Sequence, residues 1–290
     1  MTLQLGTIEQ VRVLRQTDIG YMVGTEEEEV LLHNNEVAGE IEVDDEIDVF
    51  IYSDNQNRIT ATMKTPAITT EDFGWVSVVS VMKNLGVFVN IGIAKDILVP
   101  EDELPGFYGV WPEEGDELYC ILKATRNDRL IAKLARQEDM EELAVDATES
   151  MFNKNVAGRV YRSLRVGSFI LTDEHFLGFV HESERREEPR LGQRVEGRII
   201  AVKEDGTINV SLLPRKQEGM EEDAERIYEY MEGRGGAMPF GDKTGAEDIK
   251  ERFNMSKGAF KRALGKLMKD GKVYQEEGWT YFVREEKASE

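Results

Sequence analysis

Arginine and tyrosine side chains gather near the start of a stretch spanning residues 158–213, where Tyr161 interleaves with three arginines. Guanidinium groups bind phosphates and an aromatic ring stacks on an unpaired base, so the combination suits single-stranded nucleic acid. The same stretch carries further cations downstream. The side chains that we expect on a nucleic-acid-facing side are Tyr161, Arg159, Arg162, Arg165, Arg194, Arg198 and Lys203.

A second group of basic residues lies near the C-terminus. Residues 250–272 contain eight Lys and Arg against two Asp and Glu. Such a cluster can bind a polyanion, although a lysine-rich helix face is often only solvated. The candidates for phosphate contact are Lys257, Lys261 and Arg262, with Lys266 and Lys269 behind them.

The sequence shows no set of residues with the types and spacing of a catalytic site. His33, His175 and His181 lie at no metal-ligand spacing, and Cys120 is the single cysteine. Residues 236–244 are similar to the motif of a phosphate-binding loop, in which a lysine directly follows a glycine. Here Asp242 stands between Gly241 and Lys243 and puts a negative charge where phosphate oxygens would lie. We read this segment as a flexible connector. The sequence therefore predicts no enzyme, no metal site and no cofactor.

The elements that carry the first group are short strands. Within residues 158–213, apolar residues alternate in five runs (159–161, 167–171, 177–181, 195–202 and 208–212), each closed by turn residues such as Asp-Glu or Asp-Gly. This alternation predicts a small five-stranded β-barrel.

Several short motifs in this stretch resemble the S1 RNA-binding motif: Gly158-x-Val160, residues 166–169 (VGSF), residues 178–183 (GFVHES) and Gly192-Gln193-x-Val195. S1 domains are barrels of the OB type that bind single-stranded RNA on one face. The resemblance implies that Phe169 and His181 lie on that face, where a ring can stack on a base.

The same pattern occurs three times. The first copy keeps His33 and Arg58, but carries the acidic run of residues 26–29, so we expect a structural or partner-binding role for it. The second copy keeps two residues at S1 positions, Phe88 and Arg129, and replaces the histidine by Val99. We include Phe88 and Arg129 among the candidate RNA-binding residues.

The remaining segments have helical periodicity. Residues 137–152 contain no Gly or Pro and predict an acidic connecting helix between the second and third barrels. Beyond Leu213, helices are expected at 220–231, 245–253 and 256–270, followed by a hairpin at 272–283. This order predicts a winged-helix domain, in which the third helix is the one that enters a DNA groove.

Composition limits where the protein acts. The chain has 290 residues and a net charge of −21, which opposes a polyanion at long range, but residues 152–217 hold 12 basic against 9 acidic residues. A single cysteine fits a reducing cytoplasm, and no stretch reads as a signal peptide or a membrane span. We therefore expect a cytoplasmic protein without membrane contact.

The expected fold is mainly β with a C-terminal α+β domain: S1-like barrels at 1–64, 65–137 and 152–217, a connecting helix at 138–151, and a winged helix at 218–290. This order resembles the family of conserved virulence factor B, bacterial S1 proteins. The resemblance implies a protein that binds single-stranded RNA and influences gene expression. The alternative is a transcription regulator that reads duplex DNA with its winged helix and uses the barrels to bind proteins.

Overall fold

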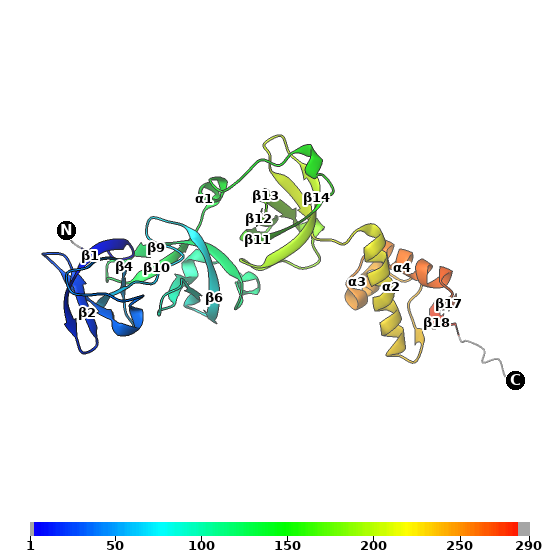
Figure 1. The fold of residues 1–290 in the computed structure, drawn as a ribbon. Coiled ribbons are helices and arrows are strands. Elements are labelled where there is room, and N and C mark those ends of the chain that lie inside the picture. Colours follow the sequence, from blue (N-terminus) through cyan, green and yellow to red (C-terminus); the bar gives the residue numbers. More distant parts are fainter. Residues whose placement is uncertain (1–2, 284–290) are drawn as a thin grey trace. The chain divides into compact units, whose positions relative to one another are not determined.

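The structure is a computed structural model that describes residues 3–283, without the side chains of residues 216–218. The chain divides into two compact units, the first ending at Leu212 and the second beginning at Leu213. The first unit contains three closed five-stranded barrels, and the second contains three helices and a small sheet (Figure 1). The predicted fold class, three barrels followed by a winged helix, is confirmed.

The three barrels have strands of similar length at equivalent places. Barrel 1 consists of β1 (Ile8–Thr17), β2 (Gly20–Gly24), β3 (Glu29–His33), β4 (Glu46–Ser53) and β5 (Ile59–Thr62). Barrel 2 consists of β6 (Gly74–Met82), β7 (Gly86–Asn90), β8 (Ile97–Pro100), β9 (Glu117–Ala124) and β10 (Leu130–Leu134). Barrel 3 consists of β11 (Asn155–Leu164), β12 (Gly167–Thr172), β13 (Leu177–His181), β14 (Arg194–Val202) and β15 (Ile208–Ser211).

All three barrels share one topology. Each places its third strand beside its fifth in parallel, while the other neighbours are antiparallel. The register shifts at the same point of each first strand, between Val13 and Arg15, Val78 and Ser80, and Val160 and Arg162. Such a bulge inserts one extra residue and bends the strand. In barrel 3 the extra residue is Tyr161.

The glycine that opens the second strand of each barrel has a steric cause. A Cβ atom at Gly20, Gly86 or Gly167 would overlap the backbone carbonyl of the third strand, at Leu32, Val99 and Val180 respectively. Only glycine allows the two strands to approach so closely.

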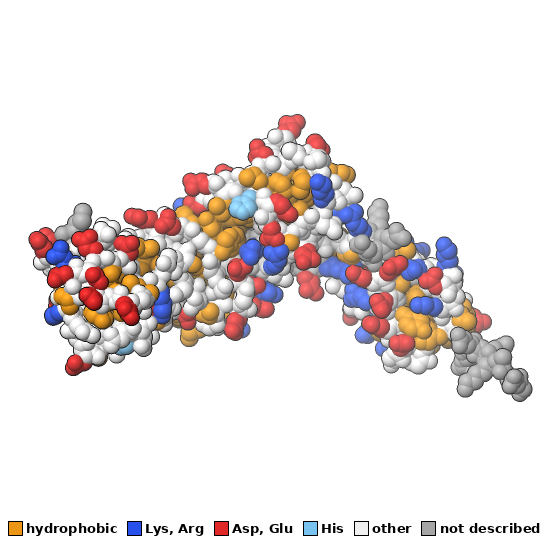
Figure 2. All heavy atoms as spheres, viewed as in Figure 1, with side chains coloured by type: hydrophobic (Ala, Val, Ile, Leu, Met, Phe, Trp, Pro, Cys, Tyr) orange, Lys and Arg blue, Asp and Glu red, His pale blue; other side chains and the backbone are white. Residues whose placement is uncertain are grey.

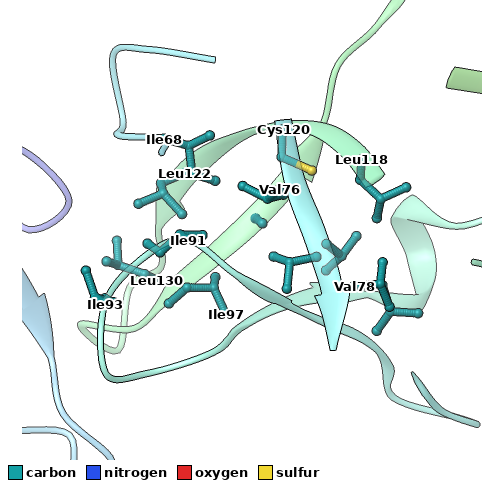
Figure 3. Close-up of a cluster of buried hydrophobic side chains, with 14 of the residues drawn as sticks. Ile68, Val76, Val78, Ile91, Ile93, Ile97, Leu118, Cys120, Leu122 and Leu130 are labelled. Carbon is teal, nitrogen blue, oxygen red and sulfur yellow. The ribbon is translucent and has the colours of Figure 1, made fainter. Parts of the chain in front are cut away.

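Each barrel encloses its own apolar core. The largest core lies in barrel 2 and includes Ile68, Val76, Ile91 and Cys120 (Figure 3). Burial raises the pKa of the Cys120 thiol, so this cysteine stays protonated, as a structural side chain would.

The connecting segment is not the single helix that its composition suggests. Helix α1 covers only Gln137–Glu141, and a 3-10 turn covers Glu149–Met151. Between them the backbone bonds to barrel 3, from Val145 N to His175 O (3.0 Å) and from Ala147 N to Gly206 O (2.9 Å). Tertiary contacts here override helix propensity. The expectation of a helix through residues 137–152 is wrong.

The second unit has the predicted winged-helix order, with one added strand. Its elements are α2 (Lys216–Glu232), β16 (Ala237–Met238), α3 (Ala246–Phe253), α4 (Lys257–Lys269), β17 (Val273–Glu276) and β18 (Trp279–Phe282). Ser256 caps α4, because its Oγ accepts a hydrogen bond from Ala259 N at 3.2 Å. Strand β16 pairs with β18, so the segment expected to be a flexible connector instead joins the sheet and buries Met238.

Candidate nucleic-acid interface

Barrel 3 presents a row of aromatic side chains on the outside of β12 and β13. Phe169 lies directly opposite Phe179 across the two strands, and their ring centroids are 5.1 Å apart. The ring of His181, two residues along β13 and on the same face, is 6.2 Å from Phe179. Both phenylalanines are half-buried, and His181 is exposed. We call Phe169, Phe179 and His181 the aromatic row.

Two arginines border the aromatic row. Arg162 pairs with Phe169 across β11 and β12, and its guanidinium carbon lies 5.7 Å from the centre of the Phe169 ring. Arg165 is exposed in the turn between these strands. A planar cation beside these rings can bind the phosphate of a nucleotide whose base lies on the row.

The sequence prediction did not include Phe179 as a site residue. Strand alternation could have identified it, because residues 179 and 181 of one strand must share a face.

Barrel 2 has no equivalent row: Phe88 faces Leu98 rather than a second ring. The residue at the position of His181 in barrel 2 is Pro100, since Gly86 pairs with Pro100 as Gly167 pairs with His181. The assignment of that position to Val99 is therefore wrong by one residue.

His181 also has a local role. Its Nδ1 accepts a hydrogen bond from Ser183 N at 3.2 Å and so caps the short turn after β13. His33 does the same for Asn35 N, also at 3.2 Å, in barrel 1. In the neutral ring this bond leaves the proton on Nε2.

Two of the predicted RNA contacts lie instead at the junction of barrels 2 and 3. Tyr161 is only 7% exposed, and its hydroxyl donates to Gln137 Oε1 at 2.9 Å. Arg159 donates from Nε to Glu117 Oε2 at 2.6 Å and lies 5.2 Å from the ring centre of Trp75. Both side chains therefore take part in contacts at this junction and lie outside the aromatic row.

The other predicted cations of the barrels are scattered. Arg198 on β14 donates to Asn153 Oδ1 at 3.4 Å, and Lys203 is exposed in the turn after β14. Arg194 forms two hydrogen bonds with Asp173, at 2.9 and 2.6 Å. Arg129 donates to Asn57 Oδ1 of barrel 1 at 3.0 Å. None of these four lies on the strands that carry the aromatic row.

Helix α4 exposes most of its predicted cations. Lys261, Arg262 and Lys269 are exposed and Lys257 is half-buried, whereas Phe260, Ala263, Leu264 and Leu267 form the buried face. Lys266 differs, because it lies 3.3 Å from Asp270 and 3.8 Å from Glu221. The basic face of α4 is therefore Lys257, Lys261, Arg262 and Lys269.

The hairpin of the second unit carries aromatic residues whose role the sequence analysis did not consider. Tyr274, Trp279 and Tyr281 share the outer face of β17 and β18, and their rings lie nearly parallel, 5.4 and 6.3 Å apart. The opposite face of the hairpin, with Val273 and Thr280, is buried.

Comparison with known proteins decides the family. Models of the virulence regulatory factor CvfB match residues 73–133 (first S1-like domain), 140–214 (second domain) and 225–282 (CvfB-like winged helix), and an S1 model matches residues 5–64. Conserved virulence factor B of Staphylococcus saprophyticus is 37% identical over 94% of this chain and 93% of its own length. The chain belongs to the conserved virulence factor B family.

Two further relatives cover nearly the whole chain. The Bacillus subtilis protein YitL is 55% identical over 92% of this chain and 89% of its own. A crystal structure from Streptococcus pneumoniae TIGR4, described as a multidomain protein with nucleic acid binding domains, is 40% identical, covers 96% of this chain and 98% of its own, and superposes with a TM-score of 0.67. The similarity of this member of the virulence factor B family to its relatives therefore extends over nearly the whole chain.

Among the described residues, no group of three or more His, Cys, Asp or Glu side chains could hold a metal ion. No helix within residues 3–283 is long and apolar enough to cross a membrane.

Proposed function

We propose that this protein binds single-stranded RNA through the aromatic row of barrel 3 and the basic face of α4, and that it regulates gene expression in the cytoplasm. The observation that carries the proposal is the contact of Phe169 with both Phe179 and Arg162. Two adjoining rings offer platforms for successive bases, and the guanidinium next to Phe169 supports a contact with a neighbouring phosphate.

The nature of the domains supports the same class of ligand. S1 and winged-helix domains recur in nucleic-acid-binding proteins, and the pneumococcal relative is described as having nucleic acid binding domains. Both are binding modules, so the proposal is for a binding protein and not for an enzyme.

The distribution of charge supports different roles for the barrels. Several acidic side chains lie on the visible face of barrel 1 (Figure 2), and residues 1–64 hold 14 acidic against 4 basic residues. Because this surface would repel a phosphate backbone, we assign barrel 1 to scaffolding or to contact with a protein partner.

The test compares affinities of the full chain for single-stranded RNA, single-stranded DNA and duplex DNA at the same salt concentration. Single-stranded RNA should bind most tightly. A clear preference for duplex DNA would contradict the proposal and favour a transcription regulator that reads DNA with α4.

A second test separates stacking from electrostatics. Phe169→Ala should cost about 1–3 kcal/mol of RNA binding, while the dependence on salt should barely change because the phosphate contacts survive. Phe152→Ala is the matched control, since Phe152 is 57% exposed on barrel 3 and lies outside the aromatic row. Thermal melting must accompany both, because a folded Phe169→Ala variant that binds RNA normally would refute the stacking role.

A further inference from the structure

A cavity of about 460 Å³ lies where barrel 2 meets barrel 3. Its barrel 2 side includes Leu104, Pro105 and Leu134, and its barrel 3 side includes Leu164 and Leu191. Its lining is divided about evenly between apolar and polar side chains, and its volume lies in the range of small-ligand sites in proteins.

The cavity adjoins the aromatic row. Tyr161 and Arg162 both line it, and both also contact Phe169, with a ring distance of 6.2 Å for Tyr161 and the guanidinium contact of 5.7 Å for Arg162. A nucleic-acid strand with one base on Phe169 would therefore have the cavity within reach of its next nucleotide.

The walls of the cavity are held in place by contacts between the barrels. Arg190 of barrel 3 hydrogen-bonds Asp116 of barrel 2 at 3.0 Å, and Leu191 packs into the core of barrel 2. Tyr161 is fixed by its bond to Gln137. The hollow is thus preformed and does not have to open for a ligand, which lowers the entropic cost of binding.

The polar lining offers hydrogen-bond partners to a base. Glu103 and Glu138 line the cavity together with Arg136 and Arg162, so its charged side chains balance, and carboxylates accept hydrogen bonds from amino groups of bases. Ser163 also lines it, and its hydroxyl oxygen is buried without a hydrogen-bond partner among the described residues. Buried polar groups are normally paired, so this wall differs from an ordinary packed interface.

We infer that this cavity, which we call the junction pocket, receives one nucleobase of the single strand whose neighbouring bases stack on the aromatic row. The inference rests on the proposed function and extends it: barrels 2 and 3 together form one RNA-binding surface. Barrel 2 contributes through its wall of the pocket, although it lacks an aromatic row of its own.

The test fills the pocket without adding a ring that could itself stack. Ser163→Leu places a larger apolar side chain at the wall of the pocket. The first strand of barrel 2 already carries an apolar residue, Val81, at the equivalent position. The two positions are equivalent because Val81 pairs with Val87 as Ser163 pairs with Ser168. Ser80→Leu, on the exposed face of that strand, is the matched control.

Ser163→Leu should lower the affinity for single-stranded RNA about five- to a hundredfold, which is the effect of losing one bound base. The steepness with which the affinity falls as salt concentration rises should not change, because no phosphate contact is lost. Ser80→Leu should bind as the unchanged protein does. Photo-crosslinking of an RNA with reactive bases should mark residues 134–138 or 161–164 of the unchanged protein, which provides a readout even if Ser163→Leu fails to fold.

The outcomes distinguish the two proposals. If the unchanged protein does not bind single-stranded RNA, the proposed function and the junction pocket both fail. If the unchanged protein binds RNA but Ser163→Leu binds it equally well, the pocket inference fails and the proposed function stands. The same holds if the RNA is crosslinked neither to residues 134–138 nor to residues 161–164.

Discussion

Arg190 of barrel 3 and Asp116 of barrel 2 form a two-pronged pair, with Nε 3.0 Å from Oδ2 and Nη2 3.3 Å from Oδ1. The hydrogen bond to Asp116 raises the pKa of Arg190, so the guanidinium stays charged. Asp116 is buried, and its Oδ2 also accepts from Glu113 N at 2.8 Å. One carboxylate thus orders a turn of barrel 2 and binds barrel 3.

Removing this carboxylate should loosen the junction between the two barrels. We expect Asp116→Ala to lower the free energy of unfolding by about 1–3 kcal/mol, because it leaves a partly buried guanidinium without its main acceptor. Urea unfolding measures the loss. In a double-mutant cycle, Arg190→Ala should cost much less once Asp116 has been removed, and strictly additive losses would contradict the coupling.

The basic face of α4 should determine part of the salt dependence of RNA binding. The logarithm of the affinity for a single strand falls with the logarithm of salt concentration at a slope of roughly −0.7 per neutralised phosphate. Replacing Lys257, Lys261 and Arg262 by Ala should therefore weaken binding and flatten the slope. Lys266→Ala is the control, since Lys266 is already paired with Asp270. An unchanged slope in the triple variant would show that this face is only solvated.

A substitution at Val166 should strengthen RNA binding. It is 56% exposed, precedes the central glycine, and its carbonyl accepts a hydrogen bond from Glu182 N, next to His181. We expect Val166→Phe to lengthen the aromatic row and to tighten RNA binding by about 1 kcal/mol, roughly fivefold. Titration of a labelled RNA measures the gain. Weaker binding by a stable, folded variant would argue against RNA passing over this turn.

Tyr161 should make the protein sensitive to alkali. Burial raises the pKa of its hydroxyl to about 12, against about 10 for an exposed tyrosine. The folded state therefore favours the neutral form, so the contribution is complete below about pH 10 and is lost as the pH rises toward 12. At about 1.4 kcal/mol per pKa unit the loss approaches 3 kcal/mol.

Tyr161→Phe tests this assignment, because it keeps the ring and removes the ionisable group. The variant should show a shallower fall in the free energy of unfolding above about pH 10, measured by urea unfolding at successive pH values. Tyr52, whose pKa burial also raises to about 12, should account for part of the fall that remains. An identical pH profile in the variant and the unchanged protein would contradict the role of Tyr161.

Periodicity and motif spacing were sufficient to predict the architecture. Period-two alternation identified the strands of three barrels, and the helix expected at 256–270 matches α4 to within one residue at each end. These features are local, so they can be read from a single sequence.

The errors arose where distant parts of the chain decide the structure. Tyr161 was expected on the RNA-facing side, but the bulge between Val160 and Arg162 makes it the extra residue of β11, and it packs beside α1. The sequence carries no signal for that bulge. The connecting segment was expected to be helical, yet Ala147 joins the core of barrel 3 instead. Phe179 is the exception, because its position two residues before His181 on one strand was a local signal that the prediction overlooked.

The capping bonds of His33 and His181 bear on how S1 repeats diverge. Both rings accept a backbone hydrogen bond that orders the turn after the third strand, whether or not the barrel has an aromatic row. A repeat that ceased to bind RNA would still lose a stabilising cap if it lost this histidine. The histidine can therefore be kept for its cap alone, so its presence in a barrel is evidence of an ordered turn and not of RNA binding; barrel 2, with Pro100 at this position, has neither the cap nor the aromatic row.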